Sequence, residues 1–145
     1  MTNIANAAVT QSGLSFERQL WMRPDIIPGL RKLTDAIHKE GAAASIQLGH
    51  CGNMSHKRIC GCTPISASSG FNLYSPTIVR GMKQSEIASM ARAYGEAVRL
   101  AREAGMDAVE IHAGIQEVKD PVEEAEYVLK EIQKCKENGI RSERA

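Results

Sequence analysis

The chain has 145 residues, with 43% apolar side chains, 24% charged side chains and a formal net charge of +1 at pH 7. This length suits one domain, and the apolar fraction is sufficient for a hydrophobic core. The balanced charge offers no basic surface for nucleic acid, and no apolar run approaches the ~20 residues that span a bilayer. The N-terminal residues lack the basic and apolar regions of a secretion signal. We therefore expect a cytoplasmic protein without a nucleic-acid or membrane partner.

The first elements in chain order are a short strand and an amphipathic helix. Residues 3–9 read NIANAAV, a small and mostly apolar run that predicts a strand. Residues 24–40 predict a helix, and Gly41 supplies its C-terminal stop. The apolar positions at helical spacing are Ile26, Ile27, Leu30, Leu33 and Ile37.

A second helix is expected between two further strands. Residues 42–48, AAASIQL, predict a strand buried on both faces. Ser85 is expected to cap a helix that runs to about Ala104, and Gly105 ends it before a strand at residues 107–112, DAVEIH. The apolar stripe of this helix comprises Ile87, Met90, Ala91, Tyr94, Ala97, Val98 and Ala101. The order strand, helix, strand, helix, strand predicts an α/β fold with a parallel sheet.

Two segments differ from this alternation. Residues 49–82 are rich in Gly, Pro, Ser and Asn and show no period, so they are expected to form a long loop. Residues 121–138 predict a C-terminal amphipathic helix with acidic residues in its first turn. Its apolar face comprises Val122, Ala125, Leu129, Ile132 and Cys135. We expect this helix to cover a sheet edge or to mediate self-association.

Two polar residues lie near the carboxyl ends of predicted strands, where parallel α/β folds bind ligands. Gln47 lies within the second strand, and His112 closes the third. An amide offers one acceptor and two donors to the edge of a planar heterocycle, and a histidine can donate to a substrate carbonyl. Equally, Gln47 could be a buried amide satisfied by the backbone, and His112 a histidine satisfied in a loop.

The cysteines are unevenly spaced, which indicates reduced thiols of a cytoplasmic protein rather than a disulfide framework. They are Cys51, Cys60, Cys62 and Cys135. Residues 50–62 hold three of them together with His50 and His56, and thiolate and imidazole are zinc ligands. Their spacing matches no common zinc motif, so we expect loop thiols and no metal site.

Two longer strings carry a resemblance to a known family. They are IPGLRKLTDAIHKEGAAASIQLGHCG at residues 27–52 and YGEAVRLAREAGMDAVEIHAG at residues 94–114. Both resemble the flavin-dependent Old Yellow Enzyme family, in particular its NADH:flavin oxidoreductase and 2,4-dienoyl-CoA reductase-like branch. The loop string CGCTPISAS at residues 60–68 is similar to the same branch. The resemblance covers residues 3–114, and residues 115–145 are expected to form a separate helical tail.

The resemblance implies a TIM (β/α) barrel that holds FMN at the carboxyl ends of its strands. The three predicted strands would correspond to barrel strands two, three and four, and three strands cannot close an eight-stranded barrel. We therefore expect a partial barrel. The implied activity is that of an ene-reductase, in which hydride passes from NAD(P)H through FMN to an activated C=C bond of a small molecule. The chain alone is expected to be incomplete and inactive. The alternative is a non-catalytic α/β module that self-associates, and a homo-oligomer is expected in either case.

The resemblance also implies roles for three residues. Gln47 matches a glutamine that hydrogen-bonds the pyrimidine side of the flavin. Asn6 matches the position at the end of barrel strand two that contacts the isoalloxazine. His112 matches the first member of a His-x-x-His or His-x-x-Asn pair that binds the electron-withdrawing oxygen of the substrate. The second member falls at Ile115, which has no side-chain donor.

Overall fold

The computed structural model describes residues 1–72 and 76–112. Its main sheet has three parallel strands in the order β1–β2–β6. They are β1 (Thr2–Ala8), β2 (Ala44–Gly49) and β6 (Ala108–His112). The expected α/β class with a parallel sheet is therefore confirmed. All three strands agree with their predicted positions within two residues.

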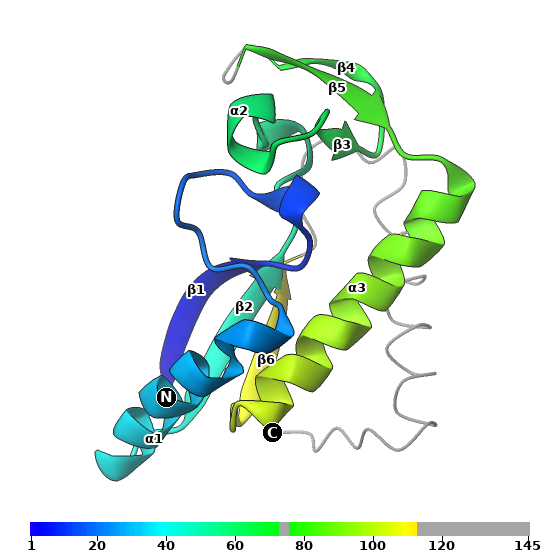
Figure 1. The fold of residues 1–145 in the computed structure, drawn as a ribbon. Coiled ribbons are helices and arrows are strands. Elements are labelled where there is room, and N and C mark those ends of the chain that lie inside the picture. Colours follow the sequence, from blue (N-terminus) through cyan, green and yellow to red (C-terminus); the bar gives the residue numbers. More distant parts are fainter. Residues whose placement is uncertain (73–75, 113–145) are drawn as a thin grey trace.

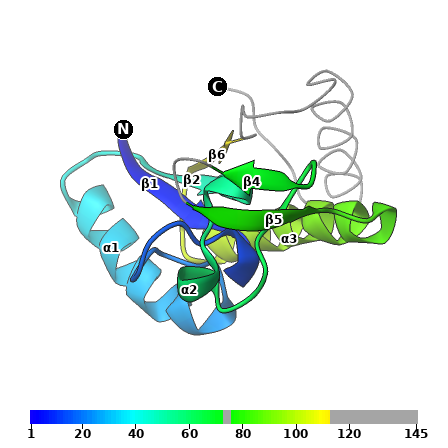
Figure 2. The same ribbon diagram turned by 90° about the horizontal axis from the view of Figure 1, so that it is seen from above.

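Two helices connect these strands and cover one face of the sheet (Figures 1 and 2). A 3-10 turn at Pro24–Ile26 leads into α1 (Ile27–Lys39), which joins β1 to β2. The longer α3 (Gln84–Glu103) leads into β6. Both helices lie on one face of the sheet, and the opposite face carries several polar side chains.

The hydrophobic core lies between the sheet and the two helices. Ile46 and Leu48 of β2 are fully buried, and they belong to one cluster with Leu30 of α1 and with Leu100 and Ala101 of α3. Each fully buried Ile or Leu side chain contributes roughly 1.5–3 kcal/mol to folding. The alternate residues of β2 therefore decide which face of the sheet the helices cover.

Both long helices end in the same glycine motif. The N–H of Gly41, at φ +73°, donates to the carbonyl of His38, and the N–H of Ala42 donates to the carbonyl of Ile37. Gly105, at φ +88°, ends α3 with the equivalent pair of bonds. This left-handed ending satisfies helix carbonyls that would otherwise lack partners, and it favours glycine. The predicted stops at both glycines are confirmed.

Leu33 does not face the core as predicted. Its side chain is 44% exposed, whereas the neighbouring Thr34 is 1% exposed. The Thr34 hydroxyl donates to the carbonyl of Leu30 at 2.9 Å, so the polar group is satisfied within the helix. A threonine bonded in this way can be buried, so the apolar pattern was wrong at Leu33 alone; the other four predicted positions belong to the core cluster or pack against it.

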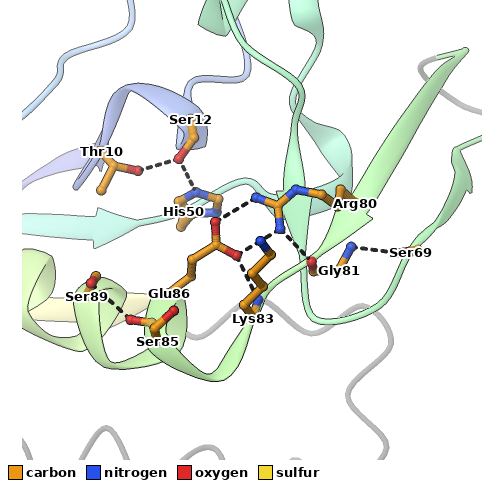
Figure 3. Close-up of polar contacts among 10 residues, drawn as sticks. All are labelled: Thr10, Ser12, His50, Ser69, Arg80, Gly81, Lys83, Ser85, Glu86 and Ser89. Atoms are coloured by element: carbon orange, nitrogen blue, oxygen red, sulfur yellow. Dashed lines mark hydrogen bonds and ion pairs between the residues drawn. The ribbon is translucent and has the colours of Figure 1, made fainter.

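The start of α3 is held by Glu86 and not by Ser85. The Glu86 carboxylate accepts the backbone N–H of Lys83 at 2.7 Å and forms two hydrogen bonds with the Arg80 guanidinium, at 2.7 and 2.8 Å (Figure 3). Ser85 lies inside the first turn, so the prediction that it caps the helix was wrong. A carboxylate at the third helical position reaches back to the N-cap N–H and takes that role.

Residues 49–82 are not a loop without secondary structure, and that prediction was wrong. They form a small second sheet in the order β3–β5–β4, which lies beyond the carboxyl ends of the main strands (Figure 1). Strands of two to five residues are too short to show an alternating pattern in the sequence. The elements are a 3-10 turn at Gly52–Met54, α2 (Lys57–Cys60), β3 (Ile65–Ser66), β4 (Gly70–Asn72) and β5 (Thr77–Gly81).

A further 3-10 turn at Gln11–Gly13 follows β1. The predicted C-terminal helix at residues 121–138 lies outside the described residues. Among the helices that the structure does describe, none combines the length and the apolar character needed to cross a membrane.

Candidate functional site

The face of the main sheet opposite the helices carries a group of polar side chains. In the parallel register, Gln47 lies beside Glu110, and Gly49 lies beside His112. Asn3 lies beside Ser45 in the same way. Successive residues of a strand alternate between faces, so these positions share the face that Ile46 and Leu48 do not. We call it the inner face: Asn3, Ser45, Gln47, Gly49, Ala108, Glu110 and His112.

Glu110 organises the polar groups of the inner face. Its Oε1 accepts a hydrogen bond from Gln47 Nε2 at 2.7 Å, and its Oε2 accepts one from Asn3 Nδ2 at 3.0 Å. Ser45 Oγ donates in turn to Asn3 Oδ1 at 3.1 Å. The amide of Gln47 is thus bonded to a side-chain carboxylate and not to the backbone. This bond fixes its orientation and leaves Oε1 without a donor among the described residues.

Asn6 interrupts β1 with an unusual backbone conformation. Its φ is +36°, and the pairing of β1 with β2 shifts register between Ile4 and Ala7. The loop after β1 holds the Asn6 carbonyl, which accepts a hydrogen bond from Gln19 Nε2 at 3.0 Å. Gln19 is 7% exposed, and its Oε1 accepts the N–H of Ser15 at 2.7 Å. A non-glycine residue at positive φ is strained, and such strain is often found at binding sites.

The side chain of Asn6 lies against the end of β2. A Cβ atom added to Gly49 would stand 2.6 Å from Asn6 Oδ1 and 3.6 Å from His112 Cβ. Asn6 and His112 therefore flank Gly49 at the carboxyl edge of the sheet. Asn6 Oδ1 is buried and has no hydrogen-bond partner in the described part of the chain. A buried acceptor without a partner costs about 1–3 kcal/mol, which a ligand N–H at this point would recover.

His112 ends β6 with an exposed side chain. Its ring makes no hydrogen bond within residues 1–72 and 76–112. The backbone carbonyl of His112 accepts a hydrogen bond from the Tyr94 hydroxyl at 3.4 Å, which ties the strand end to α3. No group among the described residues therefore competes with a donation from this ring toward a molecule at the carboxyl edge. Ile115 lies outside the described residues.

His50 supports the turn after β2 rather than the inner face (Figure 3). Its Nδ1 accepts the backbone N–H of Gly52 at 3.0 Å, so the neutral ring carries its proton on Nε2, which donates to Ser12 Oγ at 3.1 Å. Ser12 lies 2.9 Å from the hydroxyl of Thr10. Burial lowers the pKa of His50 to about 4, so the ring is neutral near pH 7.

The possible metal ligands between residues 50 and 62 are otherwise engaged. His56 Nδ1 accepts the backbone N–H of Arg58 at 3.1 Å and caps α2. Cys51 Sγ lies 4.0 Å from Asn6 Nδ2. Over residues 1–72 and 76–112, no three His, Cys, Asp or Glu side chains are placed to hold a metal ion.

The sequence analysis missed several residues of this site, among them Glu110, Gly49 and Gln19. Glu110 left a signal, because a charged residue stands between Val109 and Ile111 in an otherwise apolar strand. Gly49 and Gln19 left none. Their roles depend on contacts with Asn6, which is far from Gly49 in the chain and reaches Gln19 only through the folded loop.

A sheet of parallel strands with helices on one face and polar side chains on the other is the arrangement of part of a (β/α) barrel. The sequence profile of the NADH:flavin oxidoreductase / NADH oxidase family matches residues 1–115. The chain belongs to this family, as its motifs led us to expect.

Curated relatives support this assignment. The chain is 33% identical over 114 residues to the 4,4'-dithiodibutanoate disulfide reductase of Rhodococcus erythropolis, an alignment covering 79% of this chain and 28% of that protein. It is 36% identical over 113 residues to the probable NADH-dependent flavin oxidoreductase YqiG of Bacillus subtilis, covering 77% of this chain and 30% of that protein. The chain thus spans less than a third of the length of these relatives.

Solved structures show the same fold. Morphinone reductase in complex with tetrahydroNAD superposes with a TM-score of 0.78 at 19% identity, covering 92% of this chain and 47% of that one. The Old Yellow Enzyme homologue from Zymomonas mobilis gives 0.76 at 22% identity, covering 92% and 45%. The chain therefore has the fold of part of the Old Yellow Enzyme barrel.

Members of this family bind FMN, and the inner face fits the polar edge of an isoalloxazine ring. The flavin pyrimidine presents one N–H donor and two carbonyl acceptors. The single N–H can donate to one acceptor, and the described residues offer two candidates without a donor among themselves: the buried Asn6 Oδ1 and Gln47 Oε1. The inner face contains no Lys or Arg, so the described strands offer no cationic side chain to the FMN phosphate.

Proposed function

We propose that this chain carries the inner wall of the FMN site of an ene-reductase-class oxidoreductase. FMN would supply the hydride, taken from NAD(P)H, for an activated C=C bond of a small-molecule substrate. Gln47 and Asn6 bind the pyrimidine side of the flavin. His112 binds the electron-withdrawing oxygen of the substrate. The observation that supports this most is the buried Oδ1 of Asn6, which has no hydrogen-bond partner among the described residues and lies at the same sheet edge as His112.

Each residue has a definite task in this proposal. Glu110 accepts a hydrogen bond from Gln47 Nε2, so Gln47 Oε1 faces the ligand as an acceptor. The flipped amide would place Oε1 against the Glu110 carboxylate and is disfavoured. His112 donates an N–H to the substrate oxygen, which draws electron density from the alkene and makes its β-carbon a better hydride acceptor. Preorganised donors and acceptors of this kind need no reorganisation during the reaction.

The proposal also covers what the chain does alone. Its main sheet contributes three strands, and the described inner face lacks a cation for the phosphate, so binding of FMN is expected to be weak.

The alternative is a non-catalytic α/β module. Within the described residues, the outer edges of β6 and of β1 before Ala8 have no strand partner, and such edges favour self-association into a homo-oligomer. The free thiols of Cys51, Cys60 and Cys62 favour a cytoplasmic location.

A flavin titration tests the proposal. FMN and riboflavin are added to the 145-residue chain, and bound flavin is followed by fluorescence. We expect the two affinities to agree within about twofold, because the contacts are made to the ring. Asn6→Ala and Gln47→Ala should each weaken both flavins by about 3–10-fold, the value of a net hydrogen bond. Gln84→Ala, at an exposed position of α3, is the matched control and should have no effect.

The outcomes separate the two candidate functions. Flavin binding that is indifferent to both inner-face variants would contradict the proposed site. A colourless oligomer by light scattering, with no flavin bound at the highest concentration used, would favour the non-catalytic module instead.

A further inference from the structure

Two thiols lie together at the end of α2, away from the inner face. Cys60 is fully buried, and Cys62 is partly exposed. Their Sγ atoms are 3.5 Å apart, and the Cys60 thiol also contacts the carbonyl oxygen of Cys62 at 3.1 Å. Gly61 between them has φ +71°, a left-handed turn that brings the two side chains to the same side of the chain. Both thiols are free.

The separation of the two sulfur atoms suits the formation of a disulfide bond. A disulfide bond is about 2.0 Å long, so the two sulfur atoms need to approach by roughly 1.5 Å. Rotation of the partly exposed Cys62 side chain can supply this movement without displacing the buried Cys60. The burial of Cys60 also sets an order, because a dissolved oxidant can meet the Cys62 sulfur first.

We propose that Cys60 and Cys62 form a redox modification site that low-molecular-weight disulfides oxidise to an intramolecular disulfide. This inference is independent of the proposed flavin site. The Cys62 thiolate attacks a sulfur of the oxidant, forms a mixed disulfide and releases one thiol. Cys60 then loses its proton and attacks the Cys62 sulfur, which forms the Cys60–Cys62 bond and releases the second thiol. The protein loses two electrons and two protons, and the oxidant is reduced to two thiols.

The rate of the first step depends on the Cys62 thiolate. Burial, and then the neighbouring Cys60 thiol, raise the pKa of Cys62 to about 11. Only a small fraction is thiolate near neutral pH, so the exchange is slow there and the test is best run at about pH 8.5.

The experiment uses glutathione disulfide and the full chain, read by mass spectrometry. Tryptic cleavage after Arg58 and Arg80 gives the peptide 59–80, which holds both thiols and no other cysteine. In the wild type we expect this peptide to lose two hydrogens without retaining glutathione, and dithiothreitol should reverse the change. The same chain unfolded in urea serves as the control for the oxidising power of the mixture.

Single variants separate the two steps. Cys60→Ser removes the resolving thiol, so glutathione should accumulate on Cys62. Cys62→Ser should leave the buried Cys60 unmodified in the folded protein. Cys51→Ser is the matched control, since its thiol lies beside Asn6, and it should leave the oxidation of peptide 59–80 unchanged.

Two results would overturn the proposal. One is a wild type that keeps glutathione on Cys62 as fully as Cys60→Ser does. The other is a folded chain whose peptide 59–80 stays reduced while the urea-unfolded chain is oxidised in the same mixture.

Discussion

The Glu110 carboxylate accepts hydrogen bonds from side chains of two other strands. Its substitution therefore tests whether the orientation of the Gln47 amide matters for flavin binding. In Glu110→Gln, one carboxylate oxygen becomes an NH₂ group that cannot accept from Asn3 or Gln47, so one of the two hydrogen bonds at 2.7 and 3.0 Å is lost. We expect stability to change by less than about 1 kcal/mol, because these groups are exposed. Flavin affinity should fall by up to about 3–10-fold, because Gln47 and Asn3 then compete for the one remaining acceptor oxygen and the Gln47 amide is held less firmly.

The measurement for Glu110→Gln is a flavin titration together with the side-chain amide resonances of Gln47. Glu96→Gln is the control, because it removes the same charge from an ion pair with Arg99 on the exposed side of α3. Equal effects of the two substitutions would mean that net charge, and not the orientation of Gln47, governs binding.

His50 makes the stability of the protein depend on pH. Its pKa falls from the ordinary value of 6.5 to about 4 in the folded protein, because burial disfavours the charged ring. The unfolded chain therefore binds more protons between these values, so the free energy of unfolding is unaffected above pH 6.5 and decreases as pH falls toward 4. The full loss is roughly 3 kcal/mol, since each of the about 2.5 pKa units is worth about 1.4 kcal/mol.

His50→Asn checks this dependence, because the asparagine Oδ1 can accept the N–H of Gly52 but does not titrate. Urea unfolding of both proteins is compared at pH 7 and near pH 4. The wild type and the variant are compared by how much the free energy of unfolding falls between these pH values. Asp107 and Glu86, whose pKa values are lowered by hydrogen bonds, contribute equally to both proteins, so the difference belongs to His50. An identical loss of stability in the variant would contradict the assignment.

At the scale of the elements, a glycine in the first turn of α1 and the glycine that follows its last turn give opposite predictions. Gly41 has φ +73°, so Gly41→Ala should lower the free energy of unfolding by about 1–2 kcal/mol. Gly29 lies in the first turn of α1, where an added Cβ would meet no atom within 4 Å. Gly29→Ala should therefore raise it by about 0.5–1 kcal/mol through helix propensity. Urea denaturation followed by circular dichroism measures both, and a change of the same sign would show that the ending at Gly41 is not required.

At the scale of the whole molecule, we expect that the chain alone does not reduce an enone with NADH, even with excess FMN. The inner face offers a few hydrogen bonds, each worth about 0.5–1.5 kcal/mol net, against several kcal/mol of association entropy. In the proposed site the substrate oxygen would meet His112 but no donor at position 115, because an isoleucine side chain has none, and loss of one such donor commonly costs about 10²–10³ in rate.

The test is anaerobic. NADH oxidation and enone loss are followed while FMN is titrated in, and the chain is compared with His112→Ala. Turnover that saturates with FMN and collapses in the variant would demonstrate a working site and would contradict the expectation.

The sequence by itself determined the class of fold and the ends of the long helices. These features have local causes: apolar spacing within a helix, short apolar runs for strands, and glycines at Gly41 and Gly105 where a left-handed residue is needed. The family motifs likewise lie in continuous strings, and Gln47 and His112 could be picked out because each ends or interrupts an apolar strand. Their proposed roles are still untested.

Only the tertiary structure decided what these residues contact. Gln47 and Glu110 are 63 positions apart, and Asn3 and Glu110 are 107 apart, so no local pattern links them. The positive φ of Asn6 is held by Gln19 from the following loop, and its unpaired oxygen is visible only once it is packed against Gly49. Parallel pairing brings distant segments into one register, and the chemistry of the inner face arises from that pairing.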